Sequence, residues 1–203
     1  MIQDDLIFHG ALNPSYRLVL LHGWGANADD LMPLGKSLIQ SCKVELDLVS
    51  LSAPHPHPSG MGRQWYGLFP EDWSAVPTAV DHLHSRLRSL PNPKLPLSKT
   101  FLFGFSQGGA MAINVGCELP LRGLIACSAY PHPKWIVPKV IPPTFLFHGK
   151  QDQIVPCSAS DKIYEMLSQN KINKVEKNQF DGDHEIPINV LENIKKIINL
   201  WAS

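Results

Sequence analysis

The stretch that decides the fold is residues 100–118, which read TFLFGFSQGGAMAINVGCE. Apolar residues over 100–103 predict a buried strand, and the small residues after 107 predict a helix. Between them Ser106 stands in G-x-S-x-G, flanked by Gly104 and Gly108. A strand that reverses into a helix over one residue strains that residue and crowds its second neighbours, which favours glycine on both sides. The stretch therefore predicts an elbow with the Ser106 hydroxyl at the carboxyl edge of a sheet, although a plain strand–turn–helix with an incidental serine has the same pattern.

Strands and helices alternate on both sides of this stretch. Strands are predicted over 17–21, 44–51, 121–128, 144–147 and 174–180, with an edge strand within 1–16, and helices over 29–40, 76–90 and 158–169 and from Pro187 onward. Asn27 is expected to cap the first of these helices, with Asp29 and Asp30 in its first turn. The alternation predicts a mostly parallel, doubly wound sheet with helices on both faces. No internal repeat or linker is present, so we expect one domain over 1–203.

The composition excludes several classes of protein. Lysine plus arginine equals aspartate plus glutamate, at 18 each among 203 residues, and no basic stripe is present, so no nucleic-acid partner is expected. No apolar run approaches the ~18–20 residues that span a bilayer, so no stable membrane insertion is expected. Asp4 and Asp5 stand where a signal peptide carries positive charge. Four widely spaced cysteines without a CxxC favour reduced thiols, which together with these features predicts a cytoplasmic protein.

Three residues with complementary chemistry follow three of the predicted strands. Ligands of parallel sheets lie beyond the carboxyl ends of the strands, and Ser106, Asp152 and His184 stand in loops at such ends. A serine hydroxyl needs a base within hydrogen-bond reach, and that base needs an acid to orient it. The order Ser…Asp…His is that of α/β-hydrolases. We therefore predict a catalytic triad of these three residues.

Other residues could fill the same roles and are less favoured. His22 and His148 also follow strands, but each directly precedes a glycine in a tight turn and comes before the acid in the chain, which favours a structural role. Asp181 and Asp183 stand too close to His184 along the chain to orient its ring.

An acyl-transfer intermediate also needs two preorganised donors for its oxyanion. The backbone N–H of Gln107, directly after the nucleophile, is one candidate, and that of Trp24 in the loop 22–27 is the other. The Trp24 ring is in addition a candidate wall of the pocket.

The segment 52–77 is rich in proline and aromatic residues, and a long loop of this kind is uncommon unless it is functional. A plain surface loop over the core is the alternative, and the sequence leaves open whether the segment is a fixed wall or a mobile lid. Four of its side chains are expected to line a groove for short to medium apolar acyl chains. They are Met61, Trp65, Tyr66 and Phe69.

Paired histidines occur twice, and neither pair predicts a metal site. His55 and His57 lie in the proline-rich segment with no evident third ligand, and His82 and His84 point to different faces of a predicted helix. We therefore expect no metal ion and no cofactor.

Five segments resemble those of one known family. They are LVLLHGWGAN (18–27), APHPHPSGMGRQWYGL (53–68), GFSQGGAMA (104–112), FHGKQDQIVP (147–156) and DGDHEIP (181–187). With these the chain resembles the phospholipase/carboxylesterase family of α/β-hydrolases, which contains acyl-protein thioesterases and small bacterial carboxylesterases. It departs from that family's usual pattern at Lys150-Gln151 and at Gly67, where aspartate is common.

The resemblance implies an α/β-hydrolase fold without a large cap domain. It implies a serine carboxylesterase, lysophospholipase or acyl-thioesterase that acts on a small acyl ester or thioester, with Ser106, Asp152 and His184 as the triad and Trp24 and Gln107 as oxyanion donors. A non-catalytic ligand-binding relative is the alternative. The oligomeric state stays open, and a homodimer is compatible with the sequence.

Overall fold

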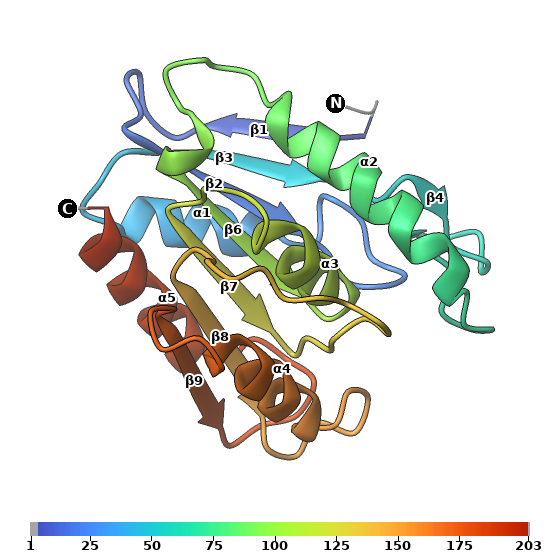
Figure 1. Ribbon diagram of the computed structural model, residues 1–203. Helices are drawn as coiled ribbons and strands as arrows, with labels where there is room; N and C mark the ends of the chain where they lie inside the picture. Colours follow the sequence, from blue (N-terminus) through green and yellow to red (C-terminus); the bar gives the residue numbers. More distant parts are fainter. Residues whose placement is uncertain (1–3, 203) are drawn as a thin grey trace.

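One sheet of seven strands carries the rest of the chain in the computed structural model, which describes residues 4–202 (Figure 1). Across the sheet the strands are β1 (Leu6–His9), β3 (Leu46–Leu51), β2 (Tyr16–Leu21), β6 (Thr100–Phe105), β7 (Gly123–Cys127), β8 (Thr144–Gly149) and β9 (Val175–Phe180). β1 is an edge strand antiparallel to β3, and every other neighbouring pair is parallel. The predicted strands are thus confirmed, with ends that shift by one or two residues.

Helices cover both faces of this sheet. They are α1 (Met32–Ser41), α2 (Val76–Arg88), α3 (Gln107–Gly116), α4 (Ser158–Ser168) and α5 (Ile188–Trp201), with 3₁₀ turns η1 (Trp73–Ala75) and η2 (Leu97–Lys99). Buried residues of α2, α3 and α4 share one apolar cluster, and those of α1 and α5 share the other. Figure 1 shows the two groups on opposite sides of the strands. The predicted doubly wound sheet is confirmed, and no large cap domain interrupts residues 4–202.

The centre of the sheet positions the elbow. β2 and β6 pair in parallel at the middle, and every residue of α3, which packs against these strands, is buried. A helix that is apolar all round belongs in a protein interior, and its small residues let it approach the strands closely. The strand–elbow–helix unit of 100–116 is therefore almost entirely buried.

The helix predicted over 29–40 begins later than expected, and Asn27 does not cap it. Residues 27–30 form a turn of their own, in which Asn27 Oδ1 accepts from the amide of Asp29 (2.8 Å) and Asp30 Oδ2 accepts from the amide of Asn27 (2.5 Å). α1 starts at Met32, with a proline in its first turn and no acid there. Asx-type turns compete with helix starts for the same side chains, which explains the error.

The segment 52–77, predicted as a long loop, has some regular structure. The segment 52–77 contains a short antiparallel pair, β4 (His55–Pro56) with β5 (Arg63–Gln64), followed by η1. Among residues 4–202 no helix combines the length and apolar character that a membrane span requires. Residues 1–3 and residue 203 lie outside the described residues. Residues 1–3 begin the region in which an edge strand, and no signal peptide, was predicted.

Candidate active site

The turn between β6 and α3 has the geometry of a strained elbow. Ser106 adopts φ 55° and ψ −119°, outside the regions that L-residues prefer. A Cβ at Gly104 would lie 2.2 Å from the carbonyl oxygen of Gly108, as the turn geometry predicts. A Cβ at Gly108 would lie 2.2 Å from the carbonyl oxygen of Leu21, at the end of β2. The second glycine is thus required by close packing against a neighbouring strand as well as by the turn.

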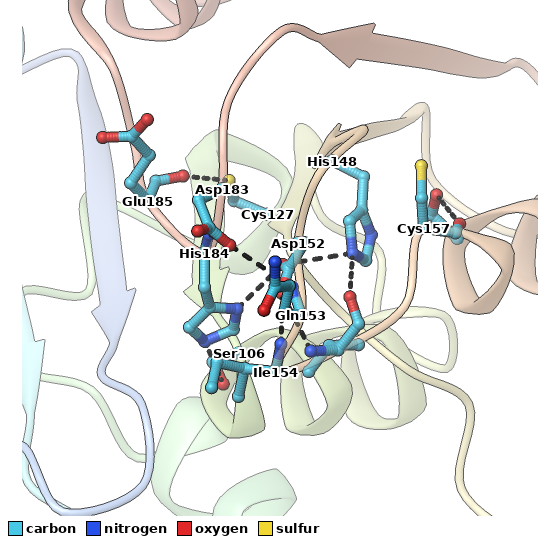
Figure 2. A network of polar contacts seen from close by, with 12 residues as sticks. Ser106, Cys127, His148, Asp152, Gln153, Ile154, Cys157, Asp183, His184 and Glu185 are labelled. Atoms are coloured by element: carbon cyan, nitrogen blue, oxygen red, sulfur yellow. Dashed lines mark hydrogen bonds and ion pairs between the residues drawn. The ribbon is translucent and has the colours of Figure 1, made fainter.

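Three side chains from three strand ends form one hydrogen-bonded chain (Figure 2). His184 Nε2 lies 3.0 Å from Ser106 Oγ, and His184 Nδ1 lies 2.8 Å from Asp152 Oδ2. Because a carboxylate only accepts, the Nδ1–H donates to Asp152, which leaves Nε2 to accept the Ser106 proton. The three residues follow β6, β8 and β9, so the parallel order of these strands brings them to one edge.

Asp152 is fixed by more than His184. Its Oδ1 accepts from the amides of Ile154 (3.0 Å) and Val155 (2.8 Å). Burial raises the pKa of Asp152, but the hydrogen bonds from Val155 and His184 outweigh burial and hold the pKa below its ordinary value. The carboxylate is therefore ionised at neutral pH and oriented before any substrate arrives.

The two other strand-end histidines bond to loop backbone, as the sequence predicts. His22 is buried, its Nδ1 donates to the Gly23 carbonyl (2.7 Å), and its Nε2 accepts from the Ala53 amide (3.0 Å). Burial lowers the pKa of His22 to about 4, so it stays neutral. His148 Nε2 donates to the Val155 carbonyl (2.8 Å) and also lies 3.3 Å from Asp152 Oδ2 (Figure 2).

The acids beside His184 hold the loop. Asp183 Oδ1 accepts from the amides of His184 (3.0 Å) and Gln153 (3.3 Å), and Asp181 pairs with Lys150 Nζ at 2.9 Å. These contacts fix the exit of β9 against the exit of β8. The backbone that carries His184 is thereby tied to the backbone that carries Asp152.

Two backbone amides lie close to the elbow. Gln107 is the first residue of α3, and the loop that carries Trp24 passes so near that a Cβ at Gly23 would lie 3.4 Å from Ser106 Cβ. Within the described residues 4–202 neither the Gln107 amide nor the Trp24 amide has an acceptor. The positive end of the α3 dipole adds to the preference for negative charge here. The site therefore has two candidate donors for an oxyanion.

Sequence reasoning missed the role of the Gln107 side chain. It is fully buried, its Nε2 donates to the Tyr66 carbonyl (2.9 Å), and its Oε1 accepts from the Trp65 amide (3.0 Å). The residue after the elbow thus clamps the aromatic segment onto the start of α3. No sequence signal identifies these partners, because both are backbone groups, 42 and 41 residues away along the chain.

A cavity of about 820 Å³ opens beside Ser106 and His184. Its wall is mainly apolar and includes Trp24, Leu68, Phe69, Trp73, Tyr130 and Ile154. The Trp24 ring lies edge-on to Phe69 at 5.2 Å between centroids, and its Nε1 donates to Gln64 Oε1 (2.9 Å). A second cavity of about 410 Å³ lies beside the same two residues and is also lined by Trp24, Asp30 and Glu185. Ser106 thus stands between two spaces.

Three of the four residues predicted to line the groove lie elsewhere. Trp65 and Tyr66 are only 1% exposed and belong to the core, and Trp65 Nε1 donates to the His22 carbonyl (2.9 Å). Met61 is 77% exposed and is not among the residues that line the cavity. Only Phe69 lies in the wall. The prediction was wrong for Trp65 and Tyr66 because their side chains pack in the core over α3 and do not line the cavity.

Comparisons with known proteins show the family to which the chain belongs. The model of the phospholipase/carboxylesterase family matches residues 3–202. Acyl-protein thioesterase 1 of Gibberella zeae is 24% identical over 190 residues, covering 80% of both chains. The crystal structure of esterase PE8 superposes with a TM-score of 0.86 and 26% identity, covering 97% of this chain and 98% of that one. A carboxylesterase from Mesorhizobium loti shares the fold, with a TM-score of 0.80 at 16% identity over 95% of this chain and 92% of that one. The chain therefore belongs to the phospholipase/carboxylesterase family of α/β-hydrolases and is an ester hydrolase of that family.

Proposed function

We propose that the protein hydrolyses small carboxylic esters or thioesters through an acyl-enzyme formed on Ser106. The observation that carries the proposal is the unbroken chain from Ser106 Oγ through His184 to Asp152, at 3.0 and 2.8 Å. A merely structural serine would not need a buried, ionised carboxylate behind its histidine partner. Two of the similar proteins, an esterase and an acyl-protein thioesterase, support the same class of reaction.

In the proposed reaction His184 Nε2 takes the Ser106 proton as Oγ attacks the carbonyl carbon of the substrate. The oxyanion that forms accepts hydrogen bonds from the amides of Gln107 and Trp24, which need not reorganise because the elbow and the loop after β2 already hold them. The imidazolium, stabilised by Asp152, then protonates the leaving alcohol or thiol. Water deacylates Ser106 by the same route in reverse, with His184 as the base.

The two cavities support a division of the substrate. We assign the acyl chain to the larger, mainly apolar cavity beside Phe69, which favours acyl groups of short to medium length. We assign the leaving group to the smaller cavity beside Asp30 and Glu185. Carboxylesterase, lysophospholipase and acyl-thioesterase activity all use this arrangement, and the leaving group distinguishes them.

A fluorophosphonate probe tests the proposal. We expect covalent labelling of the wild type and none of Ser106→Ala, while Ser59→Ala, which removes an exposed serine hydroxyl, labels like the wild type. A series of p-nitrophenyl esters beside matched thioesters then ranks acyl length and leaving group. Folded wild-type protein that resists labelling would favour the alternative, a ligand-binding relative without catalysis, and labelling of Ser106→Ala would refute the assigned nucleophile.

A further inference from the structure

A buried chain of four polar side chains leads from the core to the larger cavity, and the triad does not use it. Asn114 Nδ2 lies 2.8 Å from His132 Nδ1, and His132 Nε2 lies 2.8 Å from the Tyr66 hydroxyl. The Tyr66 hydroxyl in turn lies 2.7 Å from that of Tyr130. Asn114, His132 and Tyr66 are at most 9% exposed. Buried polar networks are costly unless every member is satisfied, so this one calls for an explanation.

The hydrogen bonds of this network all donate in one direction, from Asn114 towards Tyr130. The Asn114 amide nitrogen can only donate, so His132 Nδ1 accepts. Burial lowers the pKa of His132 to about 4, so the ring is neutral and carries its single proton on Nε2. That proton is donated to Tyr66, whose own proton is donated to Tyr130. The Tyr130 proton is then left without a partner inside the network.

The phenols keep their protons. Burial raises the pKa of Tyr66 above its ordinary value, and burial together with the nearby charge of Glu71 raises the pKa of Tyr130 to about 12. At neutral pH Tyr130 is therefore a donor. Its oxygen already accepts from Tyr66, so the network also limits the directions in which the remaining O–H can point.

Tyr130 stands at the exit of β7 in the wall of the larger cavity, which Ser106 and His184 also line. Its neighbours in that wall, Leu68 and Trp73, are mainly apolar. Glu71 lies in the same wall and accepts from Trp73 Nε1 (2.9 Å), so it brings negative charge to this end of the cavity. The wall thus combines an oriented donor with a carboxylate that disfavours anions.

We infer that Tyr130 is a specificity-determining residue, which donates a hydrogen bond to an uncharged oxygen in the acyl part of the substrate. The preferred substrates are then esters or thioesters whose acyl chain carries a ketone or ether oxygen beyond the scissile carbonyl. Purely aliphatic acyl groups leave the Tyr130 donor unpaired, and acyl chains that end in a carboxylate meet the charge of Glu71. This inference rests on the proposed function, because it concerns the acyl side of the same reaction.

The test uses p-nitrophenyl esters in pairs. Each pair has one chain length, with a ketone at the fourth, fifth, sixth or seventh carbon in one member and only methylenes in the other. We expect that for at least one position the ratio of kcat/KM, ketone over alkyl, is about tenfold higher in the wild type than in Tyr130→Phe. Tyr130→Phe should not hydrolyse alkyl esters more slowly than the wild type, because the variant removes the donor that an alkyl chain leaves unpaired. Comparing the two proteins cancels the effect of the ketone on intrinsic reactivity.

Two further measurements separate the network from the single residue. Tyr66→Phe keeps the ring but removes the bond that orients Tyr130, and it should reduce the ketone preference by less than Tyr130→Phe does. An ester with a carboxylate in place of the ketone should be hydrolysed more slowly than the ketone ester, and Glu71→Gln should narrow that difference. Melting temperatures report whether the variants fold.

The outcomes distinguish this inference from the proposed function. If the wild type hydrolyses none of the esters, the proposed function fails. If it hydrolyses alkyl and ketone esters but the ratio is the same in Tyr130→Phe at every position, the inference alone is overturned. An unchanged ketone preference in Tyr66→Phe would overturn the role of the network, and a preference for the carboxylate ester would overturn the restriction to uncharged oxygens.

Discussion

At the scale of single residues, Asp152 has two separable tasks. Oδ2 receives the His184 Nδ1–H at 2.8 Å, whereas Oδ1 receives the amides of Ile154 and Val155 at 3.0 and 2.8 Å. One oxygen therefore serves the proposed chemistry, and the other holds the 152–155 turn. A substitution that removes the acceptor for His184 but keeps the acceptor for the two amides should therefore lower activity without a matching loss of stability.

We expect Asp152→Asn to lower kcat by roughly 10³–10⁴ while most of the stability is kept. An asparagine can still accept the two amides through its carbonyl oxygen, but its NH₂ cannot accept the His184 proton. Asp152→Ala should be equally inactive and less stable by a further ~1–3 kcal/mol, because the amides of Ile154 and Val155 lose their acceptor. Kinetics on p-nitrophenyl esters and urea unfolding of both variants make the comparison; equal stability of the two would contradict it.

At the scale of elements, the Gln107 side chain joins α3 to the segment 52–77. That segment contains β4, β5 and η1 but little regular pairing, so a buried side chain takes the place of a strand partner. The clamp also explains why Trp65 and Tyr66 pack in the core while Phe69, farther along, reaches the cavity.

Gln107→Met should destabilise the protein by roughly 2–5 kcal/mol, because it leaves the Trp65 amide and the Tyr66 carbonyl buried without partners. Gln64→Met is the matched control: its bonds to Trp24 and Pro56 are less buried, so we expect less than about 1 kcal/mol. The free energy of unfolding in urea gives both values. A similar cost for the two variants would show that the clamp is not what holds the segment.

At the scale of the whole molecule, two buried histidines link stability to pH. Burial lowers the pKa of His22 and of His132 to about 4 from 6.5. Between pH 6.5 and pH 4 both histidines are protonated in the unfolded chain but stay neutral in the folded chain. The free energy of unfolding is therefore highest above about pH 6.5 and falls as the pH drops to 4. The lowered pKa of Asp152 acts in the same direction but only below about pH 4, where unfolded carboxylates begin to protonate.

We expect the free energy of unfolding to fall by roughly 2–3 kcal/mol for each histidine between pH 7 and pH 4. His132→Gln should lose about half of that dependence, because His22 remains. Urea midpoints at several pH values give the slope. A slope that is the same in the variant, or a stability that does not fall below pH 6.5, would contradict the linkage.

The mostly parallel sheet, the elbow and the meeting of Ser106, Asp152 and His184 could be predicted because the sequence patterns behind them are local. Strand periodicity, glycine spacing and the sequence of strand ends are all visible along the chain, and a parallel sheet converts them into proximity. The packing of Trp65, the turn at Asn27 and the network that ends at Tyr130 could not be predicted in this way. Each depends on partners that are distant in the chain or on competing local bonds, and no member is unusual by itself.

The contact between Gly108 and the end of β2 bears on how this elbow could be transplanted. The pentapeptide that defines the motif is shaped on one side by its own turn and on the other by the Leu21 carbonyl at the end of β2. If the five residues alone were grafted into another sheet, Gly108 at the start of the helix would lack the end of β2, against which it packs here. A graft that keeps this contact therefore includes β2 with its exit loop as well as β6, the elbow and α3.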